Sequence, residues 1–175
     1  MTPWTEGAGK AEARLAAFIG ANWERRYRGK LAPFLEDPRF VPTWNWAAAL
    51  AMPVWFLYRK LYVPFALFFF MPGVVVRLLT GSDAPATLQE MQKPENEYFL
   101  LMNAGVYLSA VITAGGVGNW LLFRRAQAAL ALLASHPVPA EEEGALLARW
   151  GGVNRMATAL FVAMSVVLTL AQLSA

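Results

Sequence analysis

Residues 98–123 read YFLLMNAGVYLSAVITAGGVGNWLLF, and Arg124 and Arg125 follow them directly. This run of 26 residues contains no formally charged side chain. A helix needs about 20 mostly apolar residues to cross the hydrocarbon core of a bilayer. Residues 98–123 therefore predict a transmembrane helix that ends at a pair of arginines, and residues 126–134 predict its helical continuation outside the membrane.

Two further apolar stretches lie on either side of this run. Residues 61–79 are apolar apart from Arg77, although Pro64 and Pro72 are expected to kink or shorten a helix there. Residues 153–173 form the third stretch. The chain of 175 residues is 57% hydrophobic and 15% charged, whereas soluble domains carry about 25% charged residues. The sequence therefore predicts an all-α integral membrane protein with about three transmembrane helices.

The N-terminal part of the chain predicts an amphipathic helix over residues 11–27. Apolar side chains recur there at spacings of three and four, which is the period of one helix face. Two interpretations stay open: the helix packs on the rest of the chain, or it lies in the membrane interface. In the second, its basic residues face anionic headgroups. The apolar face is Leu15, Phe18, Ile19, Trp23 and Tyr27, and the basic residues are Arg25, Arg26, Arg28 and Lys30.

Residues 44–58 predict a re-entrant or interfacial segment, because 15 residues are too few to span the membrane. Pro33, Pro38 and Pro42 precede it and predict an extended connector, so we divide the chain into residues 1–42 and a membrane domain of residues 43–175. Asn45 is expected to cap the helix of the segment. Tryptophans, tyrosines and the following basic pair are expected to anchor it at headgroup depth. These anchors are Trp44, Trp46, Trp55, Tyr58, Arg59, Lys60 and Tyr62.

Lysines and arginines are distributed unevenly around the three predicted spans. Of the 15, nine precede residue 61, two lie between the first and second spans, four lie around the second and third, and none follows. Cytoplasmic loops carry the excess of basic residues in membrane proteins. We therefore expect a multi-pass protein of a bacterial inner membrane, with its N-terminus in the cytoplasm and its C-terminus in the periplasm.

Residues 43–62, TWNWAAALAMPVWFLYRKLY, carry a specific resemblance. They resemble the signature Trp-Asn-Trp-Ala-Ala…Pro-x-Trp-x-x-Tyr-Arg-Lys-x-Tyr of a family of small bacterial inner-membrane proteins of unknown function. Residues 18–23 with Tyr27, and residues 118–123, look like further parts of the same pattern, although Phe123 stands where the family usually has tyrosine. The resemblance covers roughly residues 15–135. It implies a membrane fold and location, and it brings no catalytic residue.

Nothing in the sequence resembles an enzyme active site. The chain lacks cysteine, and its single histidine, His136, lies in a polar loop where an ordinary exposed residue is expected. The acidic run at residues 141–143 is expected to be solvated and to begin a helix. Residues 115–118 lack the lysine and hydroxyl residue of a phosphate-binding loop. We therefore predict no catalytic residue, metal or cofactor. The net charge of +3 is interpreted as orientation and lipid contact, with no nucleic-acid binding.

Small and polar residues in residues 98–123 predict a helix-packing face. In lipid, helices associate through close van der Waals contact and hydrogen bonds, which small residues permit. The predicted packing residues are Gly105, Ser109, Gly115, Gly116, Gly118 and Asn119. Because Gly105, Ser109 and Gly116 are spaced by four and seven, we expect their shared face to carry the principal contact.

Two hypotheses for function follow. The first is a non-catalytic accessory or assembly subunit of a larger membrane complex, possible settings being photosynthetic or respiratory assemblies. Its partners are other membrane subunits, reached through transmembrane helices, and anionic lipids. The alternative is a small homo-oligomeric transporter, channel or lipid-handling protein. The absence of acidic residues from residues 98–123 and 156–173 weighs against the usual proton or cation pathway of a transporter.

Overall fold

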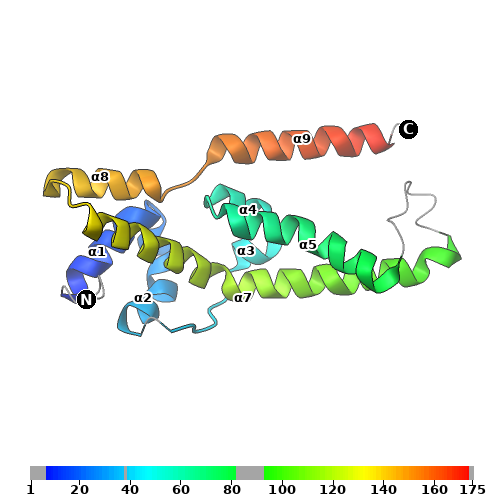
Figure 1. Cartoon of the computed structure of the whole chain (residues 1–175), viewed down its shortest axis with the longest axis horizontal. Helices are drawn as coiled ribbons and strands as arrows, with labels where there is room; N and C mark the ends of the chain where they lie inside the picture. Colours follow the sequence, from blue (N-terminus) through cyan, green and yellow to red (C-terminus); the bar gives the residue numbers. More distant parts are fainter. Residues whose placement is uncertain (1–6, 38, 82–92, 174–175) are drawn as a thin grey trace.

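The computed structural model describes residues 7–37, 39–81 and 93–173, and these residues contain helices and no strands (Figure 1). Two short turns interrupt the α-helices, a π-helical turn at Trp23–Tyr27 and a 3-10 turn at Pro94–Asn96. The α-helices are α1 (Ala8–Ile19), α2 (Arg28–Glu36), α3 (Trp46–Leu50), α4 (Val54–Tyr58), α5 (Tyr62–Thr80), α7 (Glu97–Ser135), α8 (Ala140–Trp150) and α9 (Arg155–Leu173).

Three helical stretches are long and apolar enough to cross a membrane: Tyr62–Thr80, Pro94–Ser135 and Ala140–Leu173. This confirms the predicted all-α class and its three candidate spans. Large apolar side chains on these helices are exposed, which is the pattern expected of a surface that faces lipid or other helices. They include Leu67, Phe70, Leu108, Ile112, Leu160 and Val167.

The opposite end of the molecule is a compact head made of α1, the π-helical turn, α2, α8 and the second half of α7 (Figure 1). Helix α7 continues through Arg124 and Arg125 to Ser135, as the sequence predicts. Its second half buries Phe123, Ala126 and Leu130 in one hydrophobic core with the N-terminal helices. The single helix α7, 39 residues long, therefore links the head to the candidate spans.

The N-terminal region differs from the predicted continuous helix over residues 11–27. Gly20 has a φ of 82° and ends α1, because left-handed backbone is accessible to glycine and stops the helix. The expected connector also begins later than Pro33, since Pro33 lies inside α2. The fully buried side chains of Leu31 and Phe34 hold that helix in the head core.

An ion pair joins the two outer helices of the head. Arg14 of α1 donates from Nε and Nη2 to the carboxylate of Glu143 in α8, at 2.6 and 3.0 Å. Both side chains are about four-fifths covered, at 19% and 22% exposure. Glu143, expected to lie in a solvated acidic run, therefore also contributes to the packing of α8 on α1.

Residues 44–58 fold as two short helices, α3 and α4, at the junction between head and spans. Helix α3 lies against the middle of α7 at its glycines. A Cβ atom added to Gly118 would lie 2.7 Å from the Cβ atom of Ala48, and one added to Gly115 would lie 2.8 Å from the indole of Trp44. Gly105 and Gly116 have open space instead. The close contact with α3 is therefore made by Gly115 and Gly118, two of the predicted packing residues, while the principal contact expected on the face of Gly105, Ser109 and Gly116 stays a prediction.

The two kinds of glycine predict opposite responses to a methyl group. We expect Gly118→Ala to destabilise the protein by about 1–3 kcal/mol, because the added Cβ overpacks the contact with α3. Gly116→Ala should leave stability unchanged or raise it, since the site is open and alanine favours helix. Thermal unfolding of the purified proteins in detergent measures both. Equal stability of the two variants would show that α3 does not dock on these glycines.

Candidate functional site

The end of α4 has the geometry of a Schellman motif built without glycine. The Leu61 N–H donates to the carbonyl of Phe56 at 2.8 Å, and the Lys60 N–H donates to Leu57 at 3.0 Å. Lys60 has a φ of 58°, which is uncommon for a residue with a side chain. Its ammonium group donates to the carbonyl of Arg149 at 2.8 Å. The turn thus directs the Lys60 side chain to the end of α8 and the Arg59 side chain into the head.

Arg59, Lys60 and Arg125 form a cationic junction with the carbonyl groups at three helix ends. Arg59 Nη1 donates to Ile19, after which α1 ends, at 3.3 Å. Arg125 donates to the carbonyls of Arg59 and Trp150, at 2.5 and 2.8 Å. The last carbonyls of a helix have no partner within it and carry partial negative charge. The junction therefore supplies donors to the ends of α1, α4 and α8 at once.

The junction contains no carboxylate among the described residues. Arg59 is only 3% exposed, and its guanidinium carbon lies 4.6 Å from the centre of the Tyr27 ring. Its Nε and Nη2 atoms are buried and donate no hydrogen bond to any described residue. The charge is stabilised by carbonyl dipoles and by the aromatic ring. Such a site is chemically suited to holding helices together, because its guanidinium and ammonium groups either donate to main-chain carbonyls or are buried.

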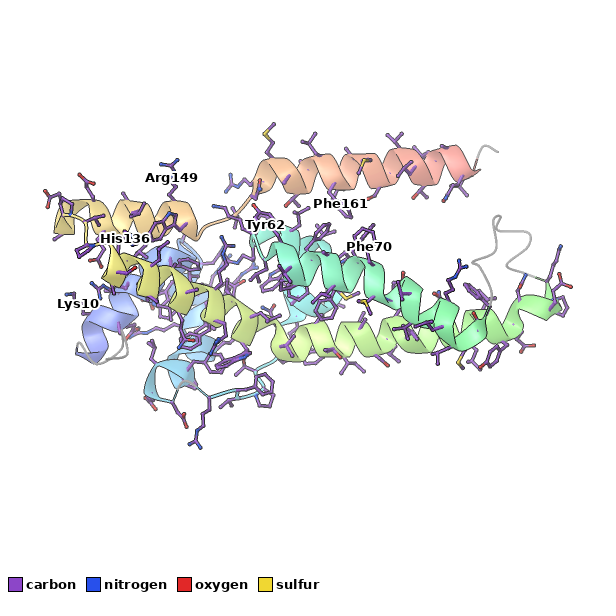
Figure 2. All side chains as sticks on the ribbon, in the orientation of Figure 1. Lys10, Tyr62, Phe70, His136, Arg149 and Phe161 are labelled. Carbon is purple, nitrogen blue, oxygen red and sulfur yellow. The ribbon has the colours of Figure 1, made fainter. Side chains whose placement is uncertain are left out.

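Asn154 attaches α9 to the same junction. Its backbone N–H donates to the Tyr58 carbonyl at 2.8 Å, and its Nδ2 donates to the Tyr62 hydroxyl at 3.1 Å. Its Oδ1 accepts the N–H of Ala157 at 3.0 Å and thereby caps α9. Further along α9, Phe161 points toward α5 and lies 5.2 Å from the Phe65 ring (Figure 2). No residue of α9 is buried.

The predicted interface anchors divide into two groups. Trp44, Trp46 and Tyr62 are exposed at 38%, 64% and 52% and are free to meet headgroups. Trp55 and Arg59 are buried at 6% and 3% exposure, so their expected position at a lipid surface is corrected to the interior. Tyr58 and Lys60 are half-buried, and both take part in the junction described above. The burial follows from the turn after α4, which folds back onto the head.

A buried amide pair fixes α3 to α7. Asn45 Nδ2 donates to Asn119 Oδ1 at 2.8 Å, and Asn119 Nδ2 donates to the Thr43 hydroxyl at 3.0 Å. Asn45 Oδ1 accepts the Ala48 N–H at 3.0 Å, which confirms its predicted role as the cap of this helix. The Asn45 N–H also donates to the carbonyl of Gly115 at 2.9 Å. Every polar group of this pair thus has a partner, as burial in apolar surroundings requires.

A long apolar groove lies between α5 and the first half of α7. It encloses about 710 Å³ and is lined by Phe68, Met71 and Pro72 on one side and by Gly105, Ser109 and Thr113 on the other. The Ser109 hydroxyl donates to the Gly105 carbonyl in its own helix at 2.8 Å, so it leaves no free donor in the groove. The groove is a surface for apolar partners.

Several residues of the site were not identified from the sequence. From the sequence, Arg125 is predicted to end a span and to lie on the cytoplasmic side, and no contact is predicted for Asn154 or Thr43. The signal for Asn154 is its place three residues before Ala157 at the start of an apolar run, which is the pattern of an N-cap. For Arg125, no local pattern indicates which carbonyls lie within its reach.

The described residues contain no group of three histidine, aspartate or glutamate side chains that would hold a metal ion. His136 is exposed between α7 and α8, and its ring lies 3.0 Å from the Ser135 hydroxyl (Figure 2). No family model, curated protein or solved structure matches the chain. The class of protein is therefore defined by the fold alone: a helical protein with three helices long and apolar enough to span a membrane, and a head whose helix ends are held by Arg59, Lys60 and Arg125.

The amide pair predicts that two asparagines of α7 respond differently to the same change. Asn119→Leu leaves Asn45 Nδ2 and the Thr43 hydroxyl without their partner, and we expect a loss of about 1–3 kcal/mol in stability. Asn103→Leu removes a half-buried amide that makes no hydrogen bond to the described residues, and should be neutral. Both changes make the span more apolar, so membrane insertion is matched. Unfolding midpoints in detergent that shift equally would contradict the pairing.

Proposed function

We propose that this chain is a non-catalytic accessory or assembly subunit of a larger complex in a bacterial inner membrane. The head lies in the cytoplasm and the end of α9 lies at the periplasmic face in this proposal. The observation that carries it is α9, a helix of 19 residues in which none is buried. A span that makes so few contacts with its own chain has most of its surface available for lipid and for the helices of other subunits.

The distribution of charge supports a structural role. Arg59, Lys60 and Arg125 donate to main-chain carbonyls at helix ends, and Arg14 pairs with Glu143. These groups hold the fold together and are not arranged around a reacting atom. The basic residues cluster at the head end of the spans, and this is the side that the positive-inside rule places in the cytoplasm.

The small residues of α7 support partner binding through the α5–α7 groove. Gly105 has open space where a side chain would stand, so another helix is able to approach the backbone closely. The same groove has the shape for a lipid acyl chain. This keeps a lipid-handling function as the second candidate, in which the chain acts as a homo-oligomer without a larger complex.

The groove provides a matched pair of variants. Gly105→Leu places a side chain in the groove, and nothing lies within 4 Å of the Cβ atom that it adds. Gly73→Leu adds the same side chain on α5, where space is equally open, and Gly73 does not line the groove. We expect the complex recovered in a mild detergent to fall at least about fivefold for Gly105→Leu, because the leucine keeps a partner helix from packing there and a contact of about one side chain is lost. The recovered complex should be unchanged for Gly73→Leu.

The measurement is the amount of each co-purifying subunit per mole of tagged chain, with the two variants expressed at equal levels. Equal recovery from both would place the partner surface elsewhere. Recovery of the chain alone, together with lipid or ion flux through proteoliposomes containing only this chain, would replace the proposed function by the second candidate.

A further inference from the structure

A small basic pocket lies where the head meets α3. It encloses about 260 Å³, slightly below the range of roughly 300–1,000 Å³ typical of drug-sized ligands. Arg25 and Arg26 of the π-helical turn and Lys30 of α2 lie on one side, and Trp46 of α3 lies on the other. Such a pocket has room for a polar group of headgroup size.

The pocket carries positive charge that the described part of the chain does not neutralise. Arg28, in the same segment, pairs with Glu12 at 2.7 Å and with Glu24 at 3.2 Å. In contrast, Arg25, Arg26 and Lys30 form no ion pair with any described residue. The sequence grouped Arg28 with these three as headgroup contacts, and the structure assigns it to the head instead.

Arg59, a fourth cation, lies next to the pocket wall and increases the positive potential in the pocket. Tyr27 forms part of the pocket wall, and the guanidinium group of Arg59 lies 4.6 Å from the centre of its ring. Like charges brought together repel one another unless an anion is bound between them. The pocket is therefore electrostatically prepared for an anion with several acceptor oxygens.

The position of the pocket along α7 places it near the head-side border of the candidate spans. Asn45, which lines the pocket, is hydrogen-bonded through its N–H to the carbonyl of Gly115. Gly115 follows Glu97, the first residue of α7, by 18 residues, which is about 27 Å along the helix axis and close to the roughly 30 Å thickness of a hydrocarbon core. Trp46 beside it is 64% exposed, as expected of an indole in the headgroup layer.

We propose that this pocket binds the phosphate group of an anionic phospholipid from the adjacent leaflet. Arg25, Arg26 and Lys30 donate to the phosphate oxygens, as guanidinium and ammonium groups do in charge-assisted hydrogen bonds. The indole of Trp46 packs beside the glycerol region. The site rests on the membrane location in the proposed function, and it adds a specific lipid to the contacts of the subunit.

Binding of phosphatidylglycerol to the full chain, purified in a neutral detergent, tests the site. Native mass spectrometry counts bound lipid during titration, with phosphatidylcholine of the same acyl chains as the neutral comparison. The triple variant Arg25→Gln, Arg26→Gln, Lys30→Gln should weaken phosphatidylglycerol binding by about a hundredfold, each charge contributing about fivefold. It should leave phosphatidylcholine binding unchanged.

A control triple variant removes the same net charge outside the pocket, through Arg124→Gln, Arg149→Gln and Arg155→Gln, all exposed positions. It should weaken binding by less than about fivefold, because only diffuse attraction is lost. Equal losses in the two triple variants, or none in either, would overturn the pocket. Neither result depends on whether the chain has a partner subunit, so a failure here is distinct from a failure of the proposed function.

A variant that keeps all three cations separates lipid binding from folding. Ala47 is exposed in the first turn of α3, where a carboxylate is favourable to the helix. Ala47→Glu should occupy the pocket with an internal anion and reduce phosphatidylglycerol binding as strongly as the triple variant does, at unchanged thermal stability. Unimpaired lipid binding by Ala47→Glu would overturn the proposal. Displacement of the lipid by an equal concentration of inorganic phosphate would overturn the lipid assignment and indicate a free-anion site.

Discussion

The carbonyl groups at the end of a helix need hydrogen-bond donors, and at the border of a membrane water does not supply them reliably. In this protein α1, α4 and α8 end close together where the head meets the three candidate spans. Arg59, Lys60 and Arg125 provide the donors, and no carboxylate from the described residues competes for them. Beside the continuous helix α7, these three cations join the head to the spans, so the arrangement of both depends on them.

The consequences for function follow from what the junction leaves free. Arg59, Lys60 and Arg125 donate to carbonyls within the chain, and a separate set of basic residues lines the pocket beside α3. The spans have an apolar groove between α5 and α7, and α9 has no buried residue. Helix surfaces left open in this way are compatible with packing against other proteins.

Much of the fold could be predicted from local patterns. The apolar runs gave the three candidate spans, and Asn45 could be identified as a cap because that role depends on residues only three positions away. The errors concern distant contacts. Arg59 was expected at headgroups because snorkelling is the usual position of a basic residue after an apolar segment, whereas the Schellman turn folds it into the head.

The docking of α3 on α7 could not be assigned from the sequence either. Spacing alone grouped Gly105, Ser109 and Gly116, but α3 docks on Gly115 and Gly118, where Trp44 and Ala48 meet the helix. Helical periodicity tells which residues share a face, and the approaching segment decides which face is used. The positive φ of Gly20 ends α1, although the apolar periodicity continues past it. Helix α2 includes Pro33, where a connector was expected, because Leu31 and Phe34 are buried in the head core.

Hydrogen–deuterium exchange of the purified full chain gives the most direct measurement of the cationic junction. Arg125→Gln removes the donor to the carbonyls of Arg59 and Trp150, while Arg124→Gln removes an exposed neighbour with the same charge. We expect amides at the ends of α4 and α8 to exchange about tenfold faster or more in the first variant, and unchanged exchange in the second. Unaltered protection at both helix ends in Arg125→Gln would contradict the dependence of the fold on this junction.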